Sequence, residues 1–137
     1  MSAYRLDHVG VAVRSIAEAL GVYEALGLRV AHREEVPSQG VVTAFLPVGE
    51  TRLELLEPIS PDSPVGKFVA RRGPGLHHLC LAVPDLAAAL RDLAGRGFRL
   101  LNENPVPGAG GRRVAFLHPE AGKGVLLELT EDAPAEG

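Results

Sequence analysis

The sequence contains an internal repeat, and this repeat constrains the fold more than any other feature. When the chain is compared with itself at an offset of 70 positions, nine of the 24 residues from 6 to 29 are identical. The match continues downstream, where residues 44–46 recur after 71 positions and residues 53–55 recur after 74. The period is too long for a solenoid, whose units are about 20 to 50 residues. The sequence therefore predicts two similar modules that face each other within one domain.

The repeat also sets the expected domain organisation. The chain has 137 residues, of which 46% are apolar, which suits one domain with a core. We expect a single domain over residues 1–137. Its parts are a first module at about 4–58, a bridge at about 59–73, a second module at about 74–131 and a polar tail at 132–137.

The first module is expected to contain a strand, a helix and three further strands. Residues 8–13 alternate as a strand does, and Ser15 with Glu18 forms a capping box that opens a helix. The three further strands are expected near 28–35, at 41–46 and at 52–57.

The second module repeats this order. Residues 78–83 alternate as a strand, Asp85 stands at the N-cap of a helix, and Gly95 and Gly97 end that helix. A short helix is expected in the bridge at 65–72, and the three further strands at 98–101, 112–117 and 125–130. The predicted fold class is α+β, built from two tandem βαβββ modules that form a metal-centred cleft.

Two histidines and two glutamates recur at equivalent places in the repeat. His8 and His78 begin the first strand of each half, and Glu54 and Glu128 lie in the last. Leucines flank both glutamates, so strand alternation places each carboxylate opposite its apolar neighbours. Bringing two carboxylates and two imidazoles together in a buried place costs free energy unless a cation balances the charge. We therefore predict a divalent metal site, with cobalt, zinc, nickel, manganese or iron as the candidate ions.

The remaining histidines and the cysteine carry weaker signals. His77 neighbours His78 in the strand and points to the opposite face, so we interpret it as structural or as supporting the ligands. His32 and His118 lie near turns, where a solvated histidine is expected. Cys80 lies in an apolar run and is interpreted as a core residue.

Two further segments each allow two interpretations. The loop at 107–111 contains three glycines and could bring backbone amides to an anion, although such loops are usually only flexible turns. Lys67, Arg71 and Arg72 form a basic cluster on the expected bridge helix, which could meet phosphates or simply face solvent.

Composition excludes several classes of partner. The chain has 14 Lys and Arg against 17 Asp and Glu, a net charge of −3, which argues against nucleic-acid binding. Charges interrupt every apolar stretch well short of the roughly 18 residues of a membrane span. The single cysteine, Cys80, forms no intrachain disulfide, so a cytoplasmic location is expected.

The twofold βαβββ repeat with this His, Glu, His and Glu set resembles the vicinal oxygen chelate superfamily. Within it, the chain resembles the methylmalonyl-CoA epimerases over nearly its whole length, most specifically in the His77-His78 pair and in residues 124–129. The matching segments are 6–9, 32–35, 39–41, 63–68, 75–78, 116–119 and 124–129.

The resemblance implies an activity and a set of roles. It implies interconversion of (2R)- and (2S)-methylmalonyl-CoA by removal and return of the C2 proton, through a metal-stabilised enolate. His8, Glu54, His78 and Glu128 would hold the metal, and Glu128 and Glu54 would be the catalytic base and acid. Cobalt is the first choice of metal, with zinc, manganese, nickel or magnesium as alternatives. A homodimer is expected on the same ground.

Two positions depart from the pattern of some relatives. Thr43 stands where some epimerases of the family carry a further glutamate as a candidate base, so another residue must fill that role. Glu54 stands where some relatives have a glutamine ligand, which adds a negative charge and a possible base.

Two other functions share this scaffold. A glyoxalase I type lyase acting on a glutathione hemithioacetal would use the same four ligands. A non-catalytic small-molecule-binding protein of the same fold would generally lack them, so the intact set argues against that alternative.

Overall fold

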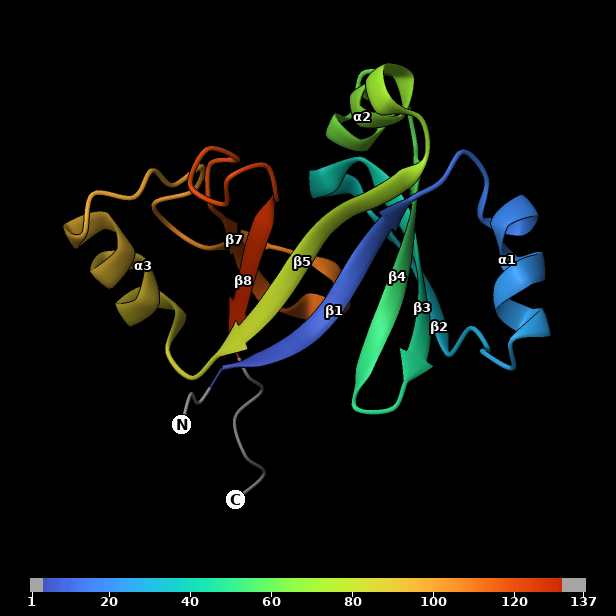
Figure 1. Ribbon diagram of the computed structural model, residues 1–137, viewed down its shortest axis with the longest axis horizontal. Coiled ribbons are helices and arrows are strands. Elements are labelled where there is room, and N and C mark those ends of the chain that lie inside the picture. The colour runs from blue at the N-terminus through green and yellow to red at the C-terminus, as the bar shows by residue number, and fades with distance from the viewer. Residues whose placement is uncertain (1–3, 132–137) are drawn as a thin grey trace. The chain divides into compact units, whose positions relative to one another are not determined.

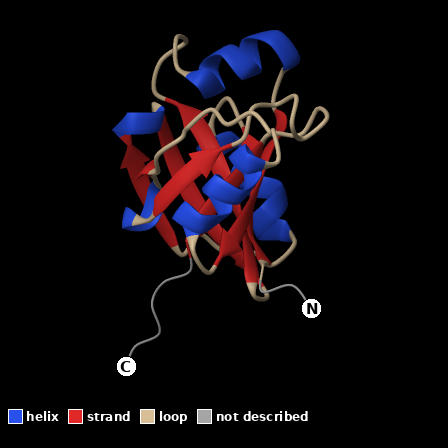
Figure 2. Ribbon diagram, turned by 90° about the vertical axis from the view of Figure 1, so that its left-hand side faces the viewer, coloured by secondary structure: helices blue, strands red, loops and turns tan. Residues whose placement is uncertain are grey.

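The computed structural model describes residues 4–131, and the expected tail at 132–137 lies outside them. The elements follow the α+β order predicted from the sequence, with one strand before and three strands after each of the first and third helices (Figures 1 and 2). The strands are β1 (Arg5–Ala12), β2 (His32–Val36), β3 (Val41–Val48), β4 (Thr51–Pro58), β5 (Gly75–Val83), β6 (Val106–Pro107), β7 (Arg113–Phe116) and β8 (Leu127–Glu131). The α-helices are α1 (Ile16–Ala25), α2 (Pro64–Arg72) and α3 (Leu86–Gly95), with short 3₁₀ turns at Pro37–Gln39 and Ala109–Gly111.

The chain divides into two compact units. One consists of residues His8–His77, and the other joins residues 4–7 to residues 78–131. Residues 59–73, expected as a bridge between the modules, lie in the unit His8–His77. The boundary falls between His77 and His78, a few residues after the expected start of the second module.

The unit His8–His77 contains a four-stranded sheet in the order β2-β3-β4-β1. Strand β1 runs parallel to β4, and the other neighbours are antiparallel. One face of this sheet packs against α1 (Figure 1). The buried residues on that side are Val13, Ile16, Ala44, Leu46 and Leu55.

Helix α1 begins where its sequence signals predict. The Ser15 side chain accepts a hydrogen bond from the Glu18 backbone N–H at 3.3 Å, which satisfies one of the free donors of the first turn. A second free donor, the Ile16 N–H, donates to Oε1 of Glu57 at 2.8 Å. The last strand of this unit therefore anchors its helix.

The unit of residues 4–7 and 78–131 repeats this construction. Its strands run in the order β5-β8-β7-β6, with β5 parallel to β8 and the other pairs antiparallel. Asp85 caps α3 by accepting from the Ala88 N–H at 3.0 Å, and Glu131 accepts from the Leu86 N–H at 3.1 Å. The core between α3 and the sheet consists of Val83, Leu86, Ala89, Leu90, Ala115, Leu117 and Leu129.

Helix α2 confirms the helix expected in the bridge. Ser63 caps it by accepting from the Gly66 N–H at 3.0 Å. A Cβ atom at position 66 would lie 2.4 Å from the Ser60 carbonyl oxygen, so the close turn before α2 requires glycine there. Within residues 4–131, no helix is long and apolar enough to cross a membrane.

Two of the predicted strands are wrong in part. Residues 28–31 lie outside β2, because Gly27 takes a positive φ of 93° and the Leu28 N–H bonds back to the Tyr23 carbonyl. Residues 98–101 form only an isolated bridge, between Leu100 and Leu117. The strand that pairs with the outer edge of β7 is instead the two-residue β6, which the sequence pattern did not reveal.

Candidate metal centre

In the unit His8–His77, strand alternation sorts the polar and apolar residues onto opposite faces. Leu53 and Leu55 face α1, and Glu54 faces the other way, as the sequence predicts. Both His8 and Glu54 are buried, with 6% and 3% of their surface exposed. His8 Nδ1 lies 2.9 Å from Glu54 Oε2. The first expected pair of ligands is therefore in contact within this unit.

Two more side chains lie next to Glu54, and a third packs on one of them. The register of the sheet places Phe45 directly beside it on β3. The Arg52 Nε donates a hydrogen bond to Glu54 Oε2 at 2.9 Å, and the Arg52 guanidinium lies 5.1 Å from the centre of the Phe45 ring. On the next strand, the His32 ring stacks on Phe45 with 5.3 Å between centroids. His32, expected to be a solvated residue near a turn, is exposed but packs against this cluster.

In the other unit, His78 and Glu128 form the matching pair. They are buried, with 6% and 4% exposed surface, and His78 Nε2 lies 3.2 Å from Glu128 Oε1. Phe116 is beside Glu128 in the register of β7 and β8, and its ring meets that of His78 edge-on at 6.1 Å. Each unit therefore contributes one buried imidazole, one buried carboxylate and one phenylalanine beside them.

The separation within each pair fits two neighbouring ligands of one metal ion. Ligand atoms about 2.1 Å from an ion and at right angles to each other lie about 3 Å apart. The distances of 2.9 Å and 3.2 Å agree with this spacing. Imidazole nitrogen with carboxylate oxygen is also a donor set that suits divalent transition metals. The residues present in each unit therefore fit a metal ion.

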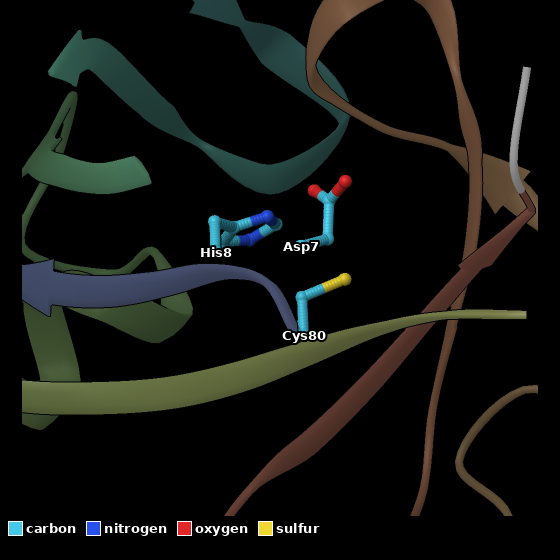
Figure 3. Close-up of side chains that lie close together, drawn as sticks. All are labelled: Asp7, His8 and Cys80. Carbon is cyan, nitrogen blue, oxygen red and sulfur yellow. The ribbon is translucent and has the colours of Figure 1, made fainter. Parts of the chain in front are cut away.

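Asp7 and Cys80 are two further buried groups with ligand chemistry. Their ligand atoms lie within 4.8 Å of each other, and Figure 3 shows them with His8, the residue that follows Asp7. Arg112 Nη1 donates to Asp7 Oδ1 at 2.6 Å, so the charge of this carboxylate is already balanced by a guanidinium. We do not include Asp7 in the ligand set. Cys80 is buried as expected, on the same face of β5 as His78 and away from the core under α3.

The other residues singled out from the sequence make contacts with different partners. His77 meets the Phe68 ring edge-on at 5.0 Å, in agreement with a structural role. His118 Nδ1 accepts from the Glu120 N–H at 3.1 Å, within a turn. Lys67, Arg71 and Arg72 lie on α2, and the Arg72 guanidinium lies 5.6 Å from the Phe68 ring centre.

The glycine loop at 107–111 forms a 3₁₀ turn between β6 and β7. The Gly108 N–H bonds to the Arg112 carbonyl at 2.9 Å, which closes this turn. Arg112, at the end of the loop, is a residue that the sequence reasoning missed, because its partner Asp7 is 105 positions away. Arg52 was also missed, although its place two residues before Glu54 puts it on the same strand face.

A comparison with protein families decides the assignment. The sequence profile of the Glyoxalase/Bleomycin resistance protein/Dioxygenase superfamily matches residues 7–116. The chain belongs to this superfamily. It also lies within the methylmalonyl-CoA epimerase family, as relatives named for that activity show. The mitochondrial methylmalonyl-CoA epimerase of Homo sapiens is 39% identical over 93% of this chain and 73% of its own length. The ethylmalonyl-CoA/methylmalonyl-CoA epimerase of Cereibacter sphaeroides is 37% identical over 93% of this chain and 97% of its own.

Solved structures agree with this assignment. A methylmalonyl-CoA epimerase in complex with methylmalonyl-CoA and NH4+ superposes with a TM-score of 0.93 and is 38% identical, with 99% of each chain covered. The resemblance inferred from the sequence, the fold class and membership of an epimerase family are therefore confirmed. The individual roles of His8, Glu54, His78 and Glu128 stay predictions.

Proposed function

We propose that this protein epimerises methylmalonyl-CoA at C2 and that His8, Glu54, His78 and Glu128 form its metal and catalytic centre. The observation that carries the proposal is the recurrence, in both units, of a buried imidazole within about 3 Å of a buried carboxylate. Relatives named as methylmalonyl-CoA epimerases support the choice of substrate.

Epimerisation requires a proton to leave one face of C2 and another to arrive on the opposite face. In the proposed reaction, one of Glu54 and Glu128 removes the proton as the base and the other supplies a proton as the acid. The two carboxylates exchange these roles for the opposite epimer. The threonine at position 43 supports this choice, because its hydroxyl cannot replace the glutamate that some relatives carry there as a candidate base. Thr43 is buried on β3 and pairs with Leu56.

The two histidines are proposed to act only as ligands. A divalent metal ion held by the four side chains would act as a Lewis acid, offsetting the negative charge that builds on the substrate oxygens as the C2 proton leaves. Cobalt remains the first choice, with zinc, manganese, nickel or magnesium as alternatives, because nitrogen and oxygen donors alone do not select among them.

Proton NMR in deuterated water tests the proposal. The purified protein, loaded with cobalt, is given (2S)-methylmalonyl-CoA, and loss of the C2 proton signal is followed together with formation of the (2R) epimer in a mutase-coupled assay. Exchange with epimer formation, abolished by EDTA and restored by cobalt, is the expected result. Failure to exchange with any of the candidate metals would overturn the proposal.

The same sample distinguishes the two alternatives. Turnover of methylglyoxal with glutathione in place of the CoA ester would indicate a glyoxalase I type lyase. Ligand binding without turnover of either compound would indicate a binding protein. Because the three outcomes differ in product, one set of NMR spectra separates them.

The proposal extends to assembly and location. We expect a homodimer, as the family resemblance implies, and light scattering after size-exclusion chromatography measures it directly. We expect the protein in the cytoplasm, where its single cysteine, the buried Cys80, would stay reduced. Cell fractionation tests the location, and recovery in an exported fraction would contradict it.

A further inference from the structure

Arg52 contacts the proposed centre but has no role in the reaction described above. Its Nε donates to Glu54 Oε2 at 2.9 Å, and the same oxygen lies 2.9 Å from His8 Nδ1. Two contacts therefore meet on one oxygen of a carboxylate that is almost completely buried. A hydrogen bond from a charged donor is strong and directional, so it fixes the orientation of the carboxylate.

The Arg52 side chain is itself held in place. Its guanidinium lies 5.1 Å from the Phe45 ring centre, a distance at which a cation is attracted to the face of an aromatic ring. The His32 ring stacks on Phe45 with an interplanar angle of 7°. The side chain of Arg52 is 28% exposed, which leaves most of it packed. A donor supported in this way can hold Glu54 firmly.

The internal repeat shows that the sheet does not need an arginine at this position. Residues 53–55 recur as 127–129, so the counterpart of Arg52 is Leu126, whose side chain has no hydrogen-bond donor. The neighbouring phenylalanine, by contrast, is present in both units, as Phe45 and Phe116. Leu126 lies directly before β8, and its carbonyl still accepts from the Leu79 N–H at 3.1 Å. The backbone pairing beside the glutamate therefore forms without an arginine. This difference points to a role for Arg52 at Glu54 and not in folding.

We propose that Arg52 is a positioning residue that holds Glu54 in the orientation needed for metal binding and for its proton transfer. The inference rests on the proposed function. Residues that hydrogen-bond to metal ligands typically change metal affinity by about 10- to 100-fold when they are removed. Loss of Arg52 is therefore expected to weaken metal binding through Glu54.

The test is a double-mutant cycle with cobalt(II) alone as the probe. Wild type, Arg52→Met, Glu54→Gln and the double variant are titrated with the metal, and binding is followed by visible absorption. Arg52→Met should lose about 10- to 100-fold in affinity, and it should cause no further loss once residue 54 is glutamine. Arg52→Lys should recover part of the loss. The control is Arg33→Met, an exposed arginine on β2, which should bind cobalt as the wild type does.

A second measurement compares the two epimers. The rate of C2 proton exchange is measured from (2R)- and from (2S)-methylmalonyl-CoA, and the ratio of the two rates is compared among the variants. Arg52→Met should shift this ratio in the same direction as Glu54→Gln, because it acts through the same carboxylate. A general loss of structure would slow both exchanges equally and leave the ratio unchanged.

Several outcomes would overturn the inference. If Arg52→Met lowers cobalt affinity by the same factor in the wild type and in the Glu54→Gln variant, Arg52 acts independently of Glu54. If Arg52→Met binds cobalt more tightly than the wild type, Arg52 acts through its charge and not by positioning. If Arg52→Met does not fold, Arg52→Gln, which keeps a donor and removes the charge, takes its place in the cycle. A wild type that binds no cobalt overturns the proposed function as well, whereas cobalt binding with independent effects overturns only the role of Arg52.

Discussion

The two units of this chain share a framework but differ in the polar groups next to it. In both, a side chain caps the helix, a carboxylate from the last strand accepts from the first helical N–H, and a phenylalanine lies beside the buried glutamate. The differences lie one or two positions away from the shared ligand residues. Arg52 contacts Glu54, whereas Leu126 precedes the corresponding Leu127-Glu128 segment.

A second difference concerns the residue before each histidine. His8 follows Asp7, which pairs with Arg112, whereas His78 follows His77, which packs on Phe68. Backbone geometry requires the shared features, since the strands and helices depend on them. The side chains around the two pairs meet no such requirement. Similar sheets therefore hold the two carboxylates in different surroundings, which would suit the two opposite roles proposed for them.

The largest effects are expected at the two histidines, which should be equivalent if the two units contribute equally to the centre. We expect His8→Ala and His78→Ala each to abolish stoichiometric cobalt binding and epimerisation while the protein stays folded, because each removes one of four ligands. Isothermal titration with cobalt and circular dichroism measure both effects. His77→Ala is the matched control and should retain metal binding and turnover. Full activity in either ligand variant would remove that histidine from the centre.

The next largest effect is expected at Glu128. Replacement by glutamine keeps the shape and removes the base, so Glu128→Gln should lower kcat by about 10³-fold with little change in stability. A coupled mutase assay gives the rate. Glu131→Gln, on the same strand, is the control and should leave kcat near that of the wild type, since the Glu131 side chain accepts from the Leu86 N–H. An unaffected rate in Glu128→Gln would exclude it as the base.

A moderate loss of stability is expected at the ion pair found in one unit. Arg112→Met leaves the Asp7 carboxylate buried without its 2.6 Å partner, with Arg5 still 3.6 Å away. We expect the free energy of unfolding to fall by about 2 kcal/mol, below the usual cost for a fully buried pair because Arg112 is partly exposed. Urea denaturation measures it. Arg113→Met, an exposed neighbour, should change stability little, and equal losses in the two variants would contradict the assignment.

The smallest effect tests the equivalence of the two helix caps. Ser15→Ala and Asp85→Ala should each lower the free energy of unfolding by about 1 kcal/mol, because each leaves a first-turn N–H without its acceptor. Urea denaturation of the two variants side by side gives the comparison. Ser15→Asp and Asp85→Ser, which exchange the caps, should stay near wild-type stability. A loss confined to one helix would show that the units do not depend equally on their caps.

Most of the framework could be predicted from the sequence because its signals are local. Ser15 and Asp85 mark the helix starts, and alternation around Glu54 and Glu128 indicates the buried face. The strand predictions failed in part at two places where another hydrogen bond takes the place of strand pairing. The Leu28 N–H bonds back to the Tyr23 carbonyl. Next to residues 98–101, the Asn102 side chain accepts from the Phe116 N–H at 2.9 Å.

The sequence by itself determined the fold class, the repeat and the four residues of the proposed centre, because periodicity and internal symmetry are written in residue order. Only the tertiary structure decided which side chains surround them. The contact of Arg52 with Glu54, the stacking of His32 on Phe45 and the pairing of Asp7 with Arg112 depend on strand register and loop paths. The contacts of His32 with Phe45 and of Asp7 with Arg112 join residues that are not neighbours in the sequence, so no local pattern predicts them.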